Sequence, residues 1–238
     1  MQPQGIENII RKHQQTFHPV VKFDPSKEKL LALDFTDRNT ALTADTIEHT
    51  AKFTAYIQQQ LQAANSRFGI GGYGENRTVY SRSRVFDAAK PGEEPRRLHL
   101  GIDIWGPAGT PVYVFLGGRV HSVGFNNKFG DYGATLILIH QLDGLPFHTL
   151  YGHLSLKDIQ KTFAGHYLSI GEQIGSFGEP IENGHWPPHL HFQIIIDMEL
   201  KEGDYPGVCK YSEKDKYLAN CPNPDLILQM NKYIANRE

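Results

Sequence analysis

Short apolar runs separated by glycine and other turn residues dominate the chain from about Tyr80 onward. Runs of about 4–8 residues are typical of strands, whereas helices need about 10–12. Gly117-Gly118, Asp143-Gly144 and Asn183-Gly184 supply turn chemistry between them and favour hairpins. The pattern therefore predicts a mainly β fold built on an antiparallel sheet. The expected strands are Val112 to Leu116, Arg119 to Gly124, Ala134 to His140, Thr149 to His153 and His191 to Ile196.

The N-terminal part of the chain has a helical pattern instead. Apolar residues recur there at three- and four-residue steps, which predicts an amphipathic helix from Thr43 or Asp45 to a point before Gly69. We interpret residues 1–79 as an accessory segment that packs on a main domain of residues 80–238, and its length suggests the hypothesis that it limits access to a cleft. Other expected elements are a helix around Ile6 to Gln15, a strand at Leu30 to Phe35, a short helix within Ser155 to Phe163 and a closing helix at Pro224 to Asn236.

Charge and hydropathy limit the partners and compartments that are expected for the chain. The formal net charge is -2 over 238 residues and no basic cluster occurs, so nucleic acid is not an expected partner. No apolar run approaches the ~20 residues of a membrane span. The first residues lack a secretory signal pattern, which predicts a cytoplasmic protein; a chain trimmed from a longer one would fit the periplasm or the cell exterior. Cys209 and Cys221 are expected to be free thiols in a reducing compartment, with a disulfide that closes one small loop as the alternative.

One cluster of polar residues lies in the segment from His99 to Asp103. The glycine at 101, the β-branched residues beside it and the following Gly106-Pro107 favour a strand that leads into a turn. In a strand, His99, Gly101 and Asp103 share one face, while the intervening apolar residues point into the core.

Two more histidine clusters follow at even spacing. His189 and His191 alternate with apolar residues, so both occupy one face of a strand. Tyr151 and His153 are expected on a common face of another strand. A single strand histidine is more often a structural residue than a ligand, but three such clusters favour one shared cleft.

The residue types in these clusters fit a catalytic zinc site. Zn²⁺ binds imidazole nitrogen and carboxylate oxygen, and a catalytic site uses three protein ligands with the fourth position left to water. Two histidines and one aspartate meet that number. Two further histidines can then take a proton from the attacking water and stabilise the oxyanion or protonate the leaving amine.

These motifs resemble the lysostaphin-type zinc endopeptidases of bacterial cell walls over about residues 95 to 196. The resemblance implies zinc ligation by His99, Asp103 and His191, catalytic roles for His153 and His189, and a groove on a mainly antiparallel sheet. It also implies a peptide or peptidoglycan-type substrate. The motifs that carry it are His99-Leu-Gly-Ile-Asp103, Gly109-Thr-Pro-Val112, Gly118-Arg-Val120, Tyr151-Gly-His153-Leu-Ser155, Gly171-Glu-Gln-Ile-Gly175 and His189-Leu-His191-Phe192.

The sequence departs from the common family pattern in two places. Residues 88–97 contain no tyrosine where some members carry one that assists the oxyanion, and Tyr80 or Arg77 are the candidates to replace it. The segment of residues 178–188 is longer than in the common family pattern and lacks the usual Thr-Gly pair. In this segment the chain more closely resembles peptidase-like domains found beside aminotransferase and phosphotransferase domains. Two alternatives to a peptidoglycan peptidase therefore stay open: a zinc amidohydrolase acting on a smaller intracellular amide, and a catalytically silent binding or regulatory module.

Overall fold

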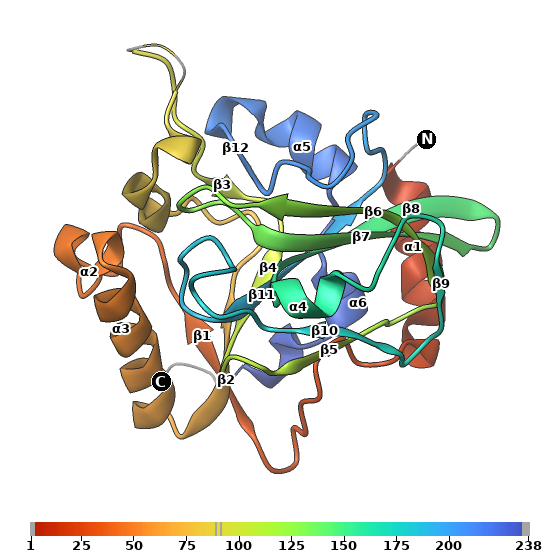
Figure 1. Ribbon diagram of the computed structural model, residues 1–238, viewed down its shortest axis with the longest axis horizontal. Coiled ribbons are helices and arrows are strands. Elements are labelled where there is room, and N and C mark those ends of the chain that lie inside the picture. The colour runs from red at the N-terminus through yellow and green to blue at the C-terminus, as the bar shows by residue number, and fades with distance from the viewer. Residues whose placement is uncertain (1–2, 89, 91, 235–238) are drawn as a thin grey trace.

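A mostly antiparallel sheet forms the centre of the molecule. The computed structural model describes residues 3–88, 90 and 92–234. Within them the main sheet has eight strands, and every neighbouring pair except β1 and β2 is antiparallel (Figure 1). The predicted mainly β fold is confirmed. Across the sheet the strands are β1 (Lys29–Leu33), β2 (Ser66–Gly71), β4 (Ile102–Trp105), β11 (His189–Ile195), β8 (Leu145–Leu154), β7 (Gly133–Leu142), β6 (Gly118–Asn126) and β9 (Tyr167–Leu168).

Two strand pairs lie outside the main sheet. β5 (Pro111–Tyr113) pairs with β10 (Gln173–Ser176), and β3 (Leu98–His99) pairs with β12 (Val208–Cys209). The single strand expected from His99 to Asp103 is therefore two short strands. The chain changes partners between them, because β3 pairs with β12 whereas β4 pairs with β2 and β11.

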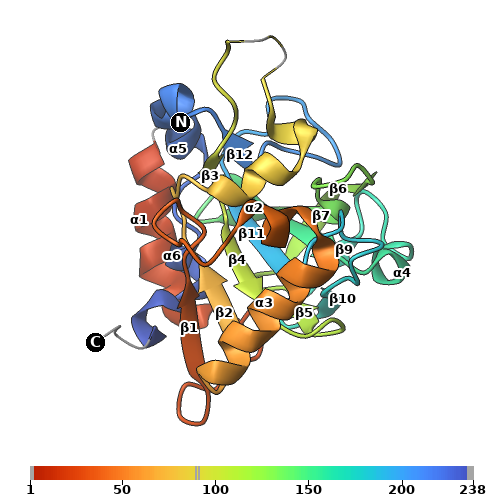
Figure 2. The same ribbon diagram turned by 90° about the vertical axis from the view of Figure 1, so that its left-hand side faces the viewer.

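Helices cover both sides of the sheet. In Figures 1 and 2, α3 lies beside β2 at one side of the molecule, and α1 lies with α6 at the other. The α-helices are α1 (Pro3–His13), α2 (Ala44–Glu48), α3 (Thr50–Ala63), α4 (Leu156–Ile159), α5 (Lys214–Asn220) and α6 (Asp225–Leu228). Short 3-10 helices are η1 (Gln14–Thr16), η2 (Thr78–Arg82), η3 (Arg84–Phe86), η4 (Tyr211–Glu213) and η5 (Asn231–Tyr233).

Two helix predictions differ in extent from the structure. The single helix expected from Thr43 or Asp45 is wrong, because His49 has an extended backbone that separates α2 from α3, and the last predicted residues belong to β2. The closing helix is confirmed only as the short α6. Gln229 has φ of 51°, a left-handed conformation that ends a helix, and η5 follows it. Positions 235 and 236 of the prediction lie outside the described residues.

The two faces of β4 and β11 have different neighbours. Ile102 and Ile104 on β4, with Leu190 and Phe192 on β11, belong to the largest apolar core, which also contains residues of α1 and α6. On the opposite face, Trp105 packs in a second cluster with side chains of α3. The polar residues of both strands share this second face, so the sheet separates the core from the site.

The N-terminal residues take part in the same sheet. β1 and β2 extend it beyond β4, and α2 and α3 connect them as a parallel crossover. The boundary between residues 79 and 80 stays a prediction. Cys209 and Cys221 are both free and buried. Among the helices of the described residues, none has the length and apolar character needed to cross a membrane.

Candidate metal centre and active site

The pairing of β4 with β11 brings two predicted site residues face to face. Asp103 lies directly opposite His191, and Trp105 lies opposite His189. Directly opposite residues of an antiparallel pair project from the same face of the sheet. The predicted alternation of β11 is therefore confirmed: both histidines leave the face opposite to the apolar core.

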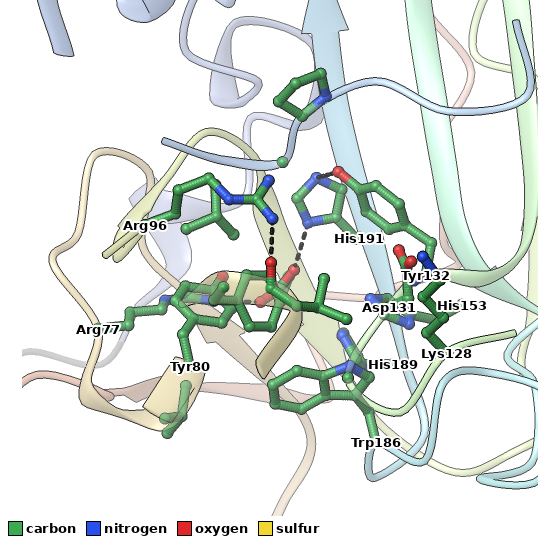
Figure 3. Close-up of a pocket in the computed structure, with 18 of the residues that line it drawn as sticks. Arg77, Tyr80, Arg96, Lys128, Asp131, Tyr132, His153, Trp186, His189 and His191 are labelled. Atoms are coloured by element: carbon green, nitrogen blue, oxygen red, sulfur yellow. Dashed lines mark hydrogen bonds and ion pairs between the residues drawn. The ribbon is translucent and has the colours of Figure 1, made fainter. Parts of the chain in front are cut away.

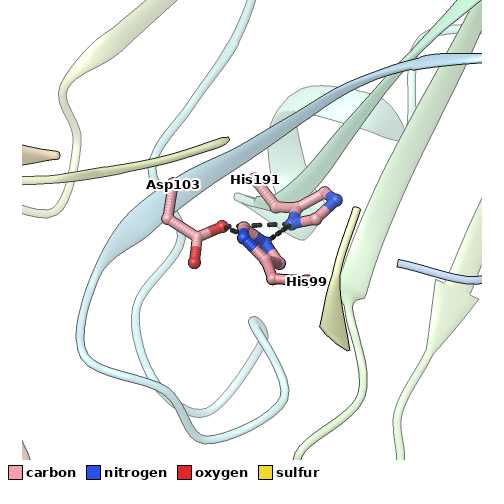
Figure 4. Close-up of side chains that lie close together, drawn as sticks. All are labelled: His99, Asp103 and His191. Carbon is pink, nitrogen blue, oxygen red and sulfur yellow. Dashed lines mark hydrogen bonds and ion pairs between the residues drawn. The ribbon is translucent and has the colours of Figure 1, made fainter. Parts of the chain in front are cut away.

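Three atoms that could bind a metal ion, one each from His99, Asp103 and His191, lie close together at this pair (Figure 4). His191 Nδ1 lies 3.0 Å from Asp103 Oδ1 and 3.0 Å from His99 Nε2, and His99 Nε2 lies 3.3 Å from Asp103 Oδ1. Ligands about 2.0–2.1 Å from a tetrahedral zinc ion stand roughly 3.3 Å from one another. The predicted ligands thus form a buried group that can hold one metal ion, and their assignment as zinc ligands stays a prediction.

Hydrogen bonds on the far side of each imidazole fix its tautomer. His99 Nδ1 donates to the backbone carbonyl of Gly72 at 2.9 Å, which leaves the Nε2 lone pair for the ion. His191 Nε2 donates to Gln193 Oε1 at 2.9 Å, which leaves Nδ1 free. The Gln193 amide group itself donates to the Pro206 carbonyl, so its oxygen must face His191. Outer hydrogen bonds of this kind are typical of metal-binding histidines.

Gln193 is a residue of the candidate site that the sequence interpretation missed. It follows His189 and His191 at the same two-residue step and therefore lies on the same face of β11. That spacing is the signal by which it could have been found.

Burial and neighbouring charges set the protonation states that a metal requires. Burial lowers the pKa of His99 to about 4, so this imidazole is neutral at neutral pH. Burial alone would raise the pKa of Asp103, but His99 and Arg77 outweigh it and hold the pKa well below its usual value. A neutral imidazole and an ionised carboxylate are the forms that bind zinc.

His153 reaches the same place through an irregular backbone. The expectation that it shares a face with Tyr151 is wrong, because Tyr151 lies in the core opposite Phe192. His153 has φ of 61°, and the register of β8 against β7 shifts nearby. This left-handed residue breaks the alternation and directs the imidazole into the cavity. Gly152 assists, because a Cβ there would lie 2.6 Å from the Tyr132 ring.

His153 and His189 present equivalent nitrogens to the cavity. Their Nδ1 atoms donate to the carbonyls of Asn183 at 2.7 Å and Pro187 at 2.8 Å. The Nε2 atom of each ring therefore carries a lone pair, and it has no hydrogen-bond partner among the described residues. The centroids of these two imidazole rings lie 4.0 Å apart, and the His189 ring stacks on the Trp105 ring with their centroids 3.9 Å apart. Burial lowers the pKa of His189 to about 4 and that of His153 well below its usual value.

A cavity of ≈ 300 Å³ opens over these groups (Figure 3). Predicted site residues in its wall are Asp103, His153, His189 and His191, whereas His99 lies behind them, fully buried. Sequence interpretation did not identify most of the remaining wall, because those residues come from several loops and short elements and carry no shared spacing. They include the aromatic residues Phe86, Trp105, Tyr132, Trp186 and Tyr205 and the charged residues Arg96, Lys128, Asp131 and Asp204.

Part of this chain is similar in sequence to known proteins. Residues 97–202 match the model of peptidase family M23. The DD-carboxypeptidase/endopeptidase Mpg of Neisseria meningitidis serogroup B is 35% identical over 102 residues, which cover 42% of this chain and 21% of that protein. The L-Ala–D-Glu endopeptidase of Bacillus subtilis is 31% identical over 136 residues, covering 54% of this chain and 39% of that protein.

Lysostaphin of Staphylococcus simulans is similar in sequence and has a solved structure. Its sequence is 31% identical over 100 residues, covering 42% of this chain and 18% of lysostaphin. The structure aligns with a TM-score of 0.38 and 23% identity, covering 64% of this chain and 50% of that chain. The aligned parts of these three relatives thus span less than half of each relative's sequence. The residues that match peptidase family M23, 97–202, contain all five predicted site residues.

Proposed function

We propose that this chain is a zinc-dependent peptidase that hydrolyses amide bonds in peptidoglycan-type peptides. The observation that carries the proposal is the convergence of His99 Nε2, Asp103 Oδ1 and His191 Nδ1 within 3.0–3.3 Å at one wall of the cavity. A bound zinc ion would supply a Lewis acid for the scissile carbonyl and a water whose pKa is lowered to about 7.

His153 and His189 are suited to move protons. Because each Nδ1 donates to a backbone carbonyl, each Nε2 can accept the proton of the attacking water and return it to the leaving amine. Their depressed pKa values keep both rings neutral, and so able to accept a proton, before the reaction begins.

Tyr80 is the better of the two candidates for the group that assists the oxyanion. Arg77 directs four of its five N–H groups at protein acceptors and is only 2% exposed, so it is poorly placed to bind a substrate. Arg77 Nη1 also donates to the Tyr80 hydroxyl at 3.3 Å. The phenol oxygen therefore accepts, and its own proton is left to donate into the cavity that Tyr80 lines. Burial raises the pKa of Tyr80, which keeps that proton in place.

The names of the relatives indicate which amide bonds to test first. They specify an L-Ala–D-Glu endopeptidase and a DD-carboxypeptidase/endopeptidase, so amides beside D-amino acids are the first substrates to test. A second candidate is a zinc amidohydrolase acting on a smaller amide. The cavity volume of ≈ 300 Å³ supports it, because this lies at the lower end of small-molecule sites, about 300–1,000 Å³.

The two candidates are separated by a substrate panel. Zinc-loaded protein would be incubated with purified peptidoglycan, with short D- and L-peptides and with small N-acyl amides, and released amines would be measured. Cleavage of peptidoglycan or D-amino-acid peptides supports the peptidase, whereas cleavage of the small amides alone supports the amidohydrolase. His49→Ala, at an exposed histidine between α2 and α3 that does not line the cavity, is the matched control and should retain turnover. No turnover on any member of the panel would contradict both.

A further inference from the structure

A buried arginine stands directly behind the metal-binding group. Arg77, at the start of η2, is 2% exposed and makes four polar contacts. Its Nη1 pairs with Asp103 Oδ2, and its Nε donates to Glu75 Oε2 at 2.7 Å. Nη1 also reaches the Tyr80 hydroxyl at 3.3 Å, and Nη2 reaches the Gly72 carbonyl at 3.3 Å.

These contacts give the two carboxylate oxygens of Asp103 different partners. Oδ2 is held by the guanidinium, while Oδ1 faces His99 and His191. A carboxylate fixed in this way offers one oxygen to an ion and cannot rotate to offer both. The Gly72 carbonyl contributes similarly, because it accepts from both His99 and Arg77.

We propose that Arg77 is a positioning residue of the metal centre, fixing Asp103 as a one-oxygen ligand and the Tyr80 hydroxyl as a donor. The inference rests on the metal site of the proposed function. A planar guanidinium is required because its fork reaches several acceptors at once, whereas a lysine ammonium is a point charge on a flexible chain. Burying the arginine is costly without partners, and the carboxylates of Asp103 and Glu75 supply them.

The residues that hold His99 and Asp103 in position from behind lie outside the region that matches the family model. Gly72, Glu75, Arg77 and Tyr80 all precede residue 97, where the match begins. They come from the loop after β2 and from η2. The segment before the peptidase domain therefore orients two of the three predicted ligands, His99 and Asp103.

The test compares metal binding by full-length variants. Arg77→Met removes the guanidinium, Arg77→Lys keeps the charge without the fork, and Arg82→Lys is the matched control. Arg82 is also a buried arginine of η2, but it contacts Thr50 and the His185 carbonyl rather than a predicted ligand. Zinc affinity would be measured by competition with a chromogenic chelator, and coordination by the visible absorption spectrum of the Co²⁺-loaded proteins.

Loss of an outer-shell partner typically weakens metal binding about 10- to 100-fold. We expect a weakening of this size in Arg77→Met and a smaller one in Arg77→Lys, with a weaker Co²⁺ absorption band as Asp103 becomes free to bind through both oxygens. Arg82→Lys should match the wild type. Wild-type zinc affinity together with a wild-type Co²⁺ spectrum in Arg77→Met would overturn the proposal, and Arg77→Lys decides by the same criteria if Arg77→Met does not fold. Zinc binding without hydrolysis in the wild type would overturn the proposed function alone, whereas absence of zinc binding overturns both.

Discussion

Gly101 lies against the imidazole ring of His191 in the structure. A Cβ atom at position 101 would come within 2.4 Å of His191 Cε1 and 2.9 Å of the Phe192 carbonyl oxygen. The backbone oxygen cannot give way, so the ring of a predicted metal ligand has its place only because residue 101 has no side chain. The glycine inside the His99–Asp103 motif is thus explained by packing.

Gly101→Ala should therefore weaken zinc binding at least about tenfold, as expected when ligand orientation is disturbed. The measurement is a zinc competition titration, with circular dichroism to verify that the variant is folded. Gly5→Ala in α1 is the control, because a Cβ there meets no atom within 4 Å. Equal zinc affinity in Gly101→Ala and the wild type would show that His191 does not need this space.

Gln193→Leu removes the acceptor that fixes the His191 tautomer. Because Leu cannot accept the Nε2 proton, we expect zinc affinity to fall about 10- to 100-fold with little change in shape at the site. Cys221→Ser is the control, since it changes another partner of Gln193 and leaves the bond to His191 intact. Unchanged affinity in Gln193→Leu would mean that this hydrogen bond does not set the tautomer.

His153→Asn and His189→Gln should separate catalysis from metal binding. Both residues line the cavity but are absent from the group of three donors, so zinc should be retained while turnover falls about 10²- to 10⁴-fold. Asparagine is chosen at 153 because it tolerates the left-handed backbone found there. Turnover would be measured on the substrate cleaved by the wild type. Loss of zinc from either variant, or undiminished turnover, would contradict the proposed roles.

The sequence predicted the site more accurately than its surroundings, for physical reasons. Two-residue alternation places His189 and His191 on one face of any strand, whatever the strand pairs with. The position of His153 and the amide orientation of Gln193 are less accessible to such reasoning. The first depends on a left-handed residue at a register shift, and the second on a carbonyl from residue 206 that orients an amide.

Long-range contacts also explain where the structure differs from the sequence prediction. The predicted helix, which ends before Gly69, includes residues 66–68 of β2, because residues 66–71 acquire their structure by pairing with β1 and β4. The sequence interpretation treats Arg77 only as a candidate to assist the oxyanion. Its actual partner, Asp103, lies 26 residues away, and nothing in the local pattern around position 77 indicates the contact.

Folding stability should fall in acid partly because of His140. This histidine is 1% exposed, and burial lowers its pKa to about 4, with neighbouring His148 contributing. Between pH 6.5 and 4 the unfolded chain binds a proton at this position and the folded protein does not, so the free energy of unfolding decreases as pH falls. The loss reaches roughly 3 kcal/mol at pH 4. Denaturant titrations at several pH values should show a shallower acid slope in His140→Gln, and an unchanged slope would contradict this.

The most direct test of a metal centre at His99, Asp103 and His191 is equilibrium dialysis against zinc, followed by elemental analysis of wild type and His191→Ala. We predict about one tightly bound zinc per wild-type chain, as in a three-ligand catalytic site, and its loss in the variant. Amide hydrolysis should disappear with a chelator and return with added zinc. Equal zinc contents in the two proteins, or hydrolysis that persists in the chelator, would contradict the account.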